Sequence, residues 1–178
     1  SPSRGLGDVY KRQFLDAGTT INAFAELIGQ QYPQGQFNIV SNSLPIALSL
    51  AGSGVPDVQL LGGTVRAITQ AVVGDTALRT LALMRADVAF IGTNALTLDH
   101  GLSTADPQEA AIKSAFVTNA HKVVVMCDSS KLGNDYLVSF APAADIDVVI
   151  TDAAAPDSFV EAPVSYTHLR AHETDSYL

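Results

Sequence analysis

The sequence has one cysteine, Cys127, among its 178 residues. This count excludes an internal disulfide framework and a zinc cluster built on cysteines, and a lone thiol fits a reducing compartment. There is no run of about 18 apolar residues that could span a membrane, and no apolar segment follows the basic N-terminus as it would in a signal peptide. We therefore expect a cytoplasmic protein with no membrane partner.

Basic residues are also few, with 10 Lys and Arg against 18 Asp and Glu, which gives a net charge of −8. Most of the acidic excess lies between residues 14 and 163. Such a surface repels a polyphosphate backbone, so we do not expect this segment to bind nucleic acid. Hydrophobic residues make up 47% and charged residues 16% of the chain, which favours one globular core over disorder.

Several motifs of cofactor and catalytic sites are missing. The sequence contains no G-x-x-x-x-G-K-[ST] phosphate loop and no G-x-S-x-G nucleophile elbow. His100 and His121 have no metal-ligand spacing to each other or to Cys127. We therefore expect neither a cofactor nor a metal site.

The two ends differ from the rest of the chain because neither shows a helical or strand period. Residues 5–13 and 164–178 resemble translated sequencing-adapter strings of the kind that contaminate assembled metagenomic reads. We therefore expect residues 1–13 and 164–178 to be non-native segments around one domain at residues 14–163. The alternative is a pair of native flexible termini.

Between these ends, short apolar runs alternate with segments of helical period, which is typical of an α/β protein. Several runs are apolar throughout, as in strands covered on both faces. The prediction is a mainly parallel sheet with helices on both faces. The expected strands are residues 14–15 (a stub), 37–40, 58–61, 88–91, 123–126 and 148–150, and the expected helices are 21–28, 44–51, 76–84 and 108–120, with Pro107 in the first turn of the last.

A small or polar segment follows each predicted strand. These segments are residues 16–20, 41–43, 62–64, 92–94, 128–131 and 151–152. In an open α/β sheet, the ligand crevice lies outside the carboxyl ends of the strands. The pattern therefore predicts one site built from several loops.

The first of these segments, residues 16–20, places a glycine and two hydroxyls where a strand turns into a helix. Gly18 allows close approach of the backbone, and the first-turn N–H groups with Thr19 and Thr20 could surround a phosphate. Alternatively, one of the threonines caps the helix. Spacing alone does not separate these alternatives.

The candidate charged residues near the same edge are Lys113, Lys131 and Arg66, which could supply positive charge for an anion. Lys113 could instead pair with Glu109 one helical turn away.

Asp16, Glu109 and Asp128 could accept hydrogen bonds from ligand hydroxyls or act as acid and base. Alternatively, Asp128 caps the turn that follows it, and Glu109 is a first-turn acid favoured by the helix dipole.

Read together, segments along the chain resemble the C-terminal sensor domain of DeoR-family bacterial transcription regulators, over residues 14–162. The segments are 14–20 (FLDAGTT), 39–47 (IVSNSLPIA), 60–66 (LLGGTVR), 73–74 (VG), 87–94 (DVAFIGTN), 101–113 (GLSTADPQEAAIK), 128–133 (DSSKLG) and 146–152 (IDVVITD). The resemblance implies a fold like ribose-5-phosphate isomerase and glucosamine-6-phosphate deaminase, with a phosphorylated sugar bound as effector rather than turned over.

The resemblance and the charge argument together give one set of candidate residues for the effector and its phosphate: Asp16, Gly18, Thr19, Thr20, Asn42, Ser43, Gly62, Gly63, Arg66, Gly92, Thr93, Asn94, Glu109, Lys113, Asp128 and Lys131. The wording of residues 93–94 and 101–107 is similar to regulators of fructose utilisation, which implies fructose 1-phosphate. The family also implies a homo-oligomer that binds DNA through an N-terminal winged helix-turn-helix domain.

Nothing before Phe14 could form that DNA-binding domain, and we expect the family's terminal strand to be missing after about residue 164. The domain is therefore expected to be truncated at both ends, with exposed sheet edges. Two other functions stay open at this point. One is a sugar-phosphate isomerase or related enzyme of the same fold, and the other is an oligomerisation module.

Overall fold

The structure is a computed structural model that describes residues 11–155 and 167–171. Its elements follow in the order β1 (Arg12–Leu15), α2 (Thr19–Gln31), β2 (Asn38–Ser41), α3 (Leu44–Gly52), β3 (Asp57–Leu60), β4 (Thr64–Arg66), β5 (Ala71–Val73), α4 (Asp75–Ala82), β6 (Ala86–Ile91), β7 (Ala95–Thr97), β8 (Gly101–Thr104), α5 (Pro107–Thr118), β9 (Ala120–Met126), η1 (Ser129–Lys131), β10 (Val138–Ala141), η2 (Ala143–Asp145), β11 (Val148–Asp152) and β12 (Thr167–Ala171).

The main sheet has seven strands in the order β12-β11-β9-β6-β1-β2-β3, and all its neighbours pair in parallel. The chain runs from β1 through β2 to β3 on one side of β1, and from β6 through β9 to β11 on the other. The order therefore reverses between β1 and β6. In such sheets the crevice outside the carboxyl ends of the strands at the reversal is the usual ligand position.

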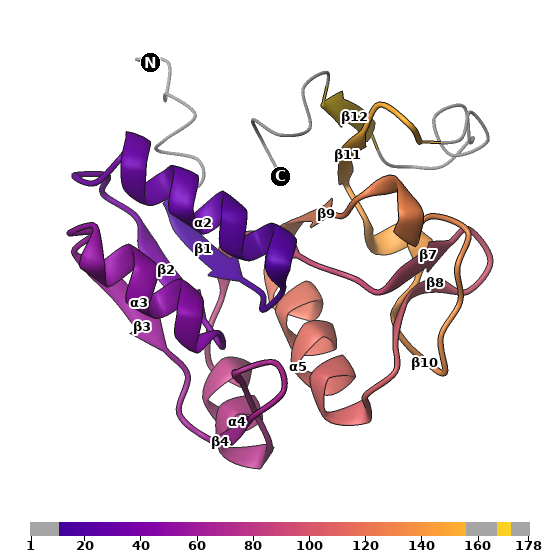
Figure 1. The fold of residues 1–178 in the computed structure, drawn as a ribbon. Coiled ribbons are helices and arrows are strands. Elements are labelled where there is room, and N and C mark those ends of the chain that lie inside the picture. Colours follow the sequence, from indigo (N-terminus) through magenta and orange to yellow (C-terminus); the bar gives the residue numbers. More distant parts are fainter. Residues whose placement is uncertain (1–10, 156–166, 172–178) are drawn as a thin grey trace, which may run out of the picture.

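Strand side chains alternate between two separate cores, one on each face of the sheet. Leu15 packs with α2 and α3, whereas its neighbour Phe14 packs with α4 and α5. The rings of Phe14 and Phe116 lie 5.1 Å apart between centroids. Each fully buried side chain of this size contributes about 1.5–3 kcal/mol. Figure 1 shows α2 and α3 stacked on one side of the strands and α5 and α4 on the other, so helices cover both faces as predicted.

Two small antiparallel sheets complete the fold, and the sequence analysis did not predict either. One consists of β10, β8 and β7, and the other is the β4–β5 hairpin. Their strands have three or four residues and include polar positions such as Ser103 and Thr104. These strands are too short to show an apolar run or an alternation in the sequence.

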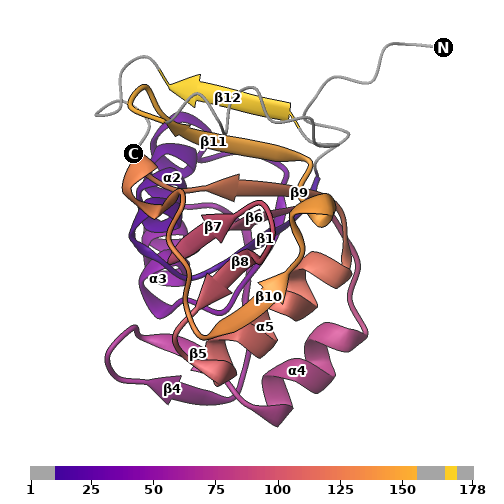
Figure 2. The same ribbon diagram turned by 90° about the vertical axis from the view of Figure 1, so that its right-hand side faces the viewer.

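The first and last strands of the domain in sequence both differ from the expected truncation. Strand β1 is not a stub, because Arg12 and Gln13 pair with β2, and Gln13 also pairs with β6. Strand β12 lies beside β11 in register, although we expected no strand after residue 164 (Figure 2). Parallel pairing uses backbone groups, so a segment without a strand period can extend an open edge. The predicted segments at residues 1–10, 164–166 and 172–178 lie outside the described residues.

Candidate functional site

A cavity of about 440 Å³ opens at the carboxyl ends of β1, β6 and β9, where the sheet order reverses. Its volume is within the range of small-molecule sites, roughly 300–1,000 Å³. It is lined by Ala17, Gly18, Thr19, Thr20, Asn22, Ser43, Pro45, Ile68, Thr69, Gly92, Thr93, Asn94, Thr104, Glu109, Lys113, Met126, Cys127, Asp128 and Lys131. Most of the residues singled out in the sequence therefore meet at one place.

A buried ion pair between Asp16 and Lys113 lies beside the cavity. Asp16 Oδ2 accepts hydrogen bonds from Lys113 Nζ and from the Gly92 N–H, the latter at 3.1 Å. Lys113 Nζ also donates to the Gly92 carbonyl at 3.1 Å and lies 5.7 Å from the centroid of the Phe140 ring. Lys113 thus connects α5 to the loops after β1 and β6, and it does not pair with Glu109 as the helical spacing had suggested.

Burial dominates the electrostatics of this pair. The Asp16 side chain is 1% exposed and the Lys113 side chain 9% exposed. Burial raises the pKa of Asp16, and the Lys113 ammonium together with the N–H donors of Gly92 and Ala17 offsets that effect only in part. The positive charge of Lys113 is therefore already matched within the protein.

The first turn of α2 faces the cavity and has no side-chain cap. Gly18 is the N-cap, with φ 143° and ψ 160°, and neither Thr19 nor Thr20 supplies a side-chain cap. This φ and ψ region is essentially restricted to glycine. Of the four α-helices in the described ranges, α2 has neither a side-chain cap nor a first-turn acid. Its N–H groups and helix dipole are thus available to an anion in the cavity.

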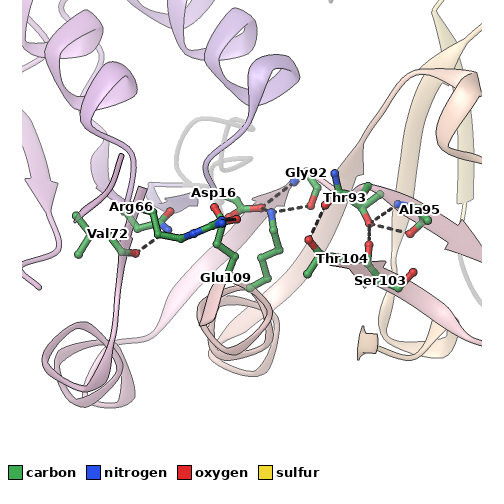
Figure 3. A network of polar contacts seen from close by, with 12 residues as sticks. Asp16, Arg66, Val72, Gly92, Thr93, Ala95, Ser103, Thr104 and Glu109 are labelled. Atoms are coloured by element: carbon green, nitrogen blue, oxygen red, sulfur yellow. Dashed lines mark hydrogen bonds and ion pairs between the residues drawn. The ribbon is translucent and has the colours of Figure 1, made fainter. Parts of the chain in front are cut away.

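The loop after β6 is fixed by hydroxyl groups. The Thr93 hydroxyl lies 2.8 Å from the Ala95 carbonyl and 3.2 Å from that of Ser103, and it accepts a bond from the Ala95 N–H. Thr104 donates to Asn94 Oδ1 at 2.5 Å. Figure 3 shows this network continuing from Gly92 towards Asp16. The amide of Asn94 is therefore held in place at the cavity wall.

Arg66 is not among the residues that line the cavity. Its guanidinium bonds Glu109 Oε2 at 2.5 Å (Figure 3) and also lies 3.5 Å from Asp106 Oδ2. Asp106 in turn caps α5 by accepting the Glu109 N–H. Glu109 does line the cavity, and Arg66 fixes its position.

The loop after β9 supplies the remaining charged groups. Asp128 caps η1 by accepting the N–H and hydroxyl of Ser130, so the capping alternative describes its contacts. Lys131, at the end of η1, lines the cavity and makes no side-chain hydrogen bond or ion pair within the part of the chain that the structure describes. Lys131 therefore differs from Lys113, whose charge is matched.

Three other predicted residues lie outside the cavity lining. Asn42 is buried and donates to the Val72 carbonyl at 3.1 Å, which holds β5 against the main sheet. A Cβ on Gly63 would meet Val72 Cγ1 at 2.8 Å, so the glycine there serves the packing of the hairpin. Gly62 is exposed and is also absent from the lining.

The sequence analysis missed Ala17, Asn22, Pro45, Ile68, Thr69, Thr104, Met126 and Cys127 as lining residues. Most of them are next to a predicted residue or one turn away, so a wider window around each motif would have included them. Ile68 and Thr69 belong to the turn of an unpredicted hairpin, and nothing in the sequence indicated them.

Within residues 11–155 and 167–171, no group of three or more His, Cys, Asp or Glu side chains could hold a metal ion. In the same ranges, no helix combines the length and apolar character needed to cross a membrane.

Curated proteins similar to this chain include transcriptional regulators and repressors. The chain is 40% identical over 139 residues to the HTH-type transcriptional regulator GlpR of Haloferax volcanii, covering 78% of this chain and 53% of that protein. It is 28% identical over 148 residues to the glycerol-3-phosphate regulon repressor of Escherichia coli K12, covering 83% of this chain and 58% of the repressor. The chain thus spans little more than half the length of these relatives.

Among solved structures, ribose 5-phosphate isomerase A from Neisseria gonorrhoeae is similar over 68% of this chain and 45% of its own length, with 18% identity and a TM-score of 0.48. The family model described as the DeoR C terminal sensor domain matches residues 10–153. The chain belongs to this family of sensor domains.

Proposed function

We propose that this chain is the effector-binding part of a transcriptional regulator and that it binds a phosphorylated sugar in the cavity between β1, β6 and β9. The observation that carries the proposal is the uncapped N-terminus of α2, where Gly18 opens the helix directly into the cavity. A phosphate there accepts hydrogen bonds from the free N–H groups of the first turn and is stabilised by the helix dipole.

Lys131 supports the same assignment, because an acidic protein must provide local positive charge to attract an anion. This residue lines the cavity, and its ammonium group has no internal acceptor among the described residues. The ammonium of Lys113 instead stays with Asp16 and orders the loops on which the ligand rests.

Binding without turnover also fits the surroundings of the three carboxylates that are the candidate bases of the enzyme alternative. Asp16 is held by Lys113, Glu109 by Arg66, and Asp128 by Ser130. A general base must be free to take a proton from its substrate. Two relatives are named as a transcriptional regulator and a regulon repressor, and these names favour a regulatory function over the isomerase alternative.

Fructose 1-phosphate is our first candidate effector, and glycerol 3-phosphate is the second because one relative is named as the repressor of the glycerol-3-phosphate regulon. In the parent protein, the bound effector would order the loops around the cavity. This change would bias the arrangement of N-terminal DNA-binding domains in a homo-oligomer.

Calorimetric titration and thermal unfolding of the purified chain test the proposal. A binding effector should raise Tm by mass action, corresponding to about 2.7 kcal/mol at a hundredfold excess over Kd, whereas fructose or glycerol should have no effect. Lys131→Ala should weaken binding, whereas Lys11→Ala, which removes an exposed lysine outside the cavity lining, should not. If neither phosphate binds, or if the chain converts either one, the proposal is wrong.

A further inference from the structure

The β4–β5 hairpin contributes a wall to the cavity that comes from outside the main sheet. Ile68 and Thr69, in the turn of this hairpin, line the cavity. The Ile68 side chain is nevertheless 87% exposed to solvent. A large branched apolar side chain at the edge of the cavity offers a surface that a ligand can cover.

The hairpin is anchored at both ends, so this wall has a defined position. On one side, β5 is buried, the Leu44 N–H donates to the Gln70 carbonyl at 3.1 Å, and Asn42 donates to the Val72 carbonyl. On the other side, Arg66 bonds Glu109 and Asp106 at the start of α5. The hairpin therefore contacts both α3 and α5.

The position of the turn relative to the phosphate site sets which part of a ligand it contacts. Lining residues follow β9, β6, β1 and β2, four neighbouring strands, so the cavity extends across three strand spacings, about 14 Å. Lys131 lies at the β9 end and the N-terminus of α2 follows β1. Ser43, Pro45 and the hairpin turn lie towards the β2 end.

We propose that the β4–β5 turn is the element that determines specificity by length, with Ile68 contacting the end of the ligand remote from the phosphate. This inference rests on the proposed function. A phosphate between α2 and Lys131 occupies the part of the cavity from β9 to β1 and leaves the β2 end to the carbon skeleton. A six-carbon sugar phosphate fills that end and covers Ile68, whereas a three-carbon phosphate does not reach it. Arg66 is the positioning residue that holds the turn against α5.

Titration of the purified chain with fructose 1-phosphate, glycerol 3-phosphate and inorganic phosphate separates the two proposals. Wild-type binding of fructose 1-phosphate or glycerol 3-phosphate tests the proposed function. Ile68→Ala tests the length selection, and it should weaken fructose 1-phosphate at least about tenfold more than glycerol 3-phosphate, as expected for lost apolar contact in a pocket. Leu83→Ala removes an equally exposed apolar side chain outside the cavity lining and should change neither affinity.

A second pair of variants tests the role of Arg66. Arg66→Gln should reduce the ratio between the two affinities because the turn loses its contact with α5, and Arg66→Lys should restore part of the ratio. An equal loss for both ligands in Ile68→Ala and Arg66→Gln would overturn the inference. Wild-type preference for glycerol 3-phosphate would overturn it as well, while leaving the proposed function standing.

Discussion

Lys113 Nζ donates a hydrogen bond to Asp16 Oδ2 although the two residues are 97 positions apart in the sequence. Asp16 directly follows strand β1 of the main sheet, and Lys113 lies in α5 on one face of that sheet. Their ion pair joins that helix to the loops after β1 and β6. A contact inside the protein thus fixes the position of these loops beside the cavity.

Lys113→Met should destabilise the fold by about 3–5 kcal/mol at neutral pH, because it leaves the buried Asp16 carboxylate without its counter-charge. Urea unfolding measures this loss. Combining it with Asp16→Asn should recover much of the stability, since no charge then remains buried. Strict additivity of the two single losses would contradict this interpretation of the pair.

The same variant has a defined pH dependence. Burial raises the pKa of Asp16 above its ordinary value of 3.8 in the wild type, and losing Lys113 removes an effect that lowers it. A folded-state pKa above the unfolded value favours folding below the unfolded pKa, and this advantage is lost as pH rises through the folded pKa. The deficit of Lys113→Met should therefore shrink on acidification. A deficit that grows as pH falls would be inconsistent with a buried carboxylate.

Arg12 and Asp87 provide a test at the other end of β1. Hydrogen bonding from Arg12 lowers the pKa of Asp87 below 3.8. The stabilisation is therefore present above that value and is lost as pH falls through the folded pKa. Because Arg12 is 55% exposed, Asp87→Asn should cost at most about 1 kcal/mol at pH 7 and progressively less as the pH falls through the folded pKa of Asp87. Equal unfolding curves at pH 7 would show that the pair contributes nothing.

The sequence predicted the sheet and the polar strand ends well because both depend on short, local patterns. The strands at residues 37–40, 88–91 and 123–126 are all present with small shifts, and Gly18 opens the helix after β1 as expected. Local patterns could not choose between partners for Lys113. Glu109, one turn away, is the acid nearest to Lys113 in the sequence, but tertiary packing places Asp16 against Lys113 instead.

The hairpin at residues 64–73 shows the other limit of the sequence. Its strands have three residues each, and its turn is exposed, so neither composition nor periodicity marks Ile68 as a cavity residue. Strand β12 shows a similar limit, because backbone pairing along β11 organises a segment with no strand period.

Cys127 gives a single-site readout of the cavity's integrity. Desolvation by burial raises the pKa of its thiol to about 12 from an ordinary value of 9.0. Since the thiolate is the reactive form, alkylation at pH 8 should be about a thousandfold slower in the folded chain than in urea. Mass spectrometry of iodoacetamide-treated protein measures both rates. Fast labelling of the folded chain would mean that water reaches Cys127 through the cavity.

Gly18→Ala tests whether the turn at residues 16–20 needs a glycine for its backbone angles or for the space around it. A Cβ at this position would meet no atom within 4 Å, so the substitution introduces no collision. The cost comes from the backbone, because φ 143° with ψ 160° is a region that only glycine adopts readily, and the strain is about 1–3 kcal/mol. Relief of that strain requires new backbone angles at the helix start, which changes the direction of its first N–H groups. We therefore expect Gly18→Ala to lower Tm by a few degrees and to weaken sugar-phosphate binding more than Lys131→Ala does.

Gly54→Ala is the matched control, since Gly54 also has a positive φ and open space around it but lies outside the cavity lining. It should lower Tm with little change in affinity. Equal affinities for wild type and Gly18→Ala would show that the α2 N-terminus does not hold the phosphate.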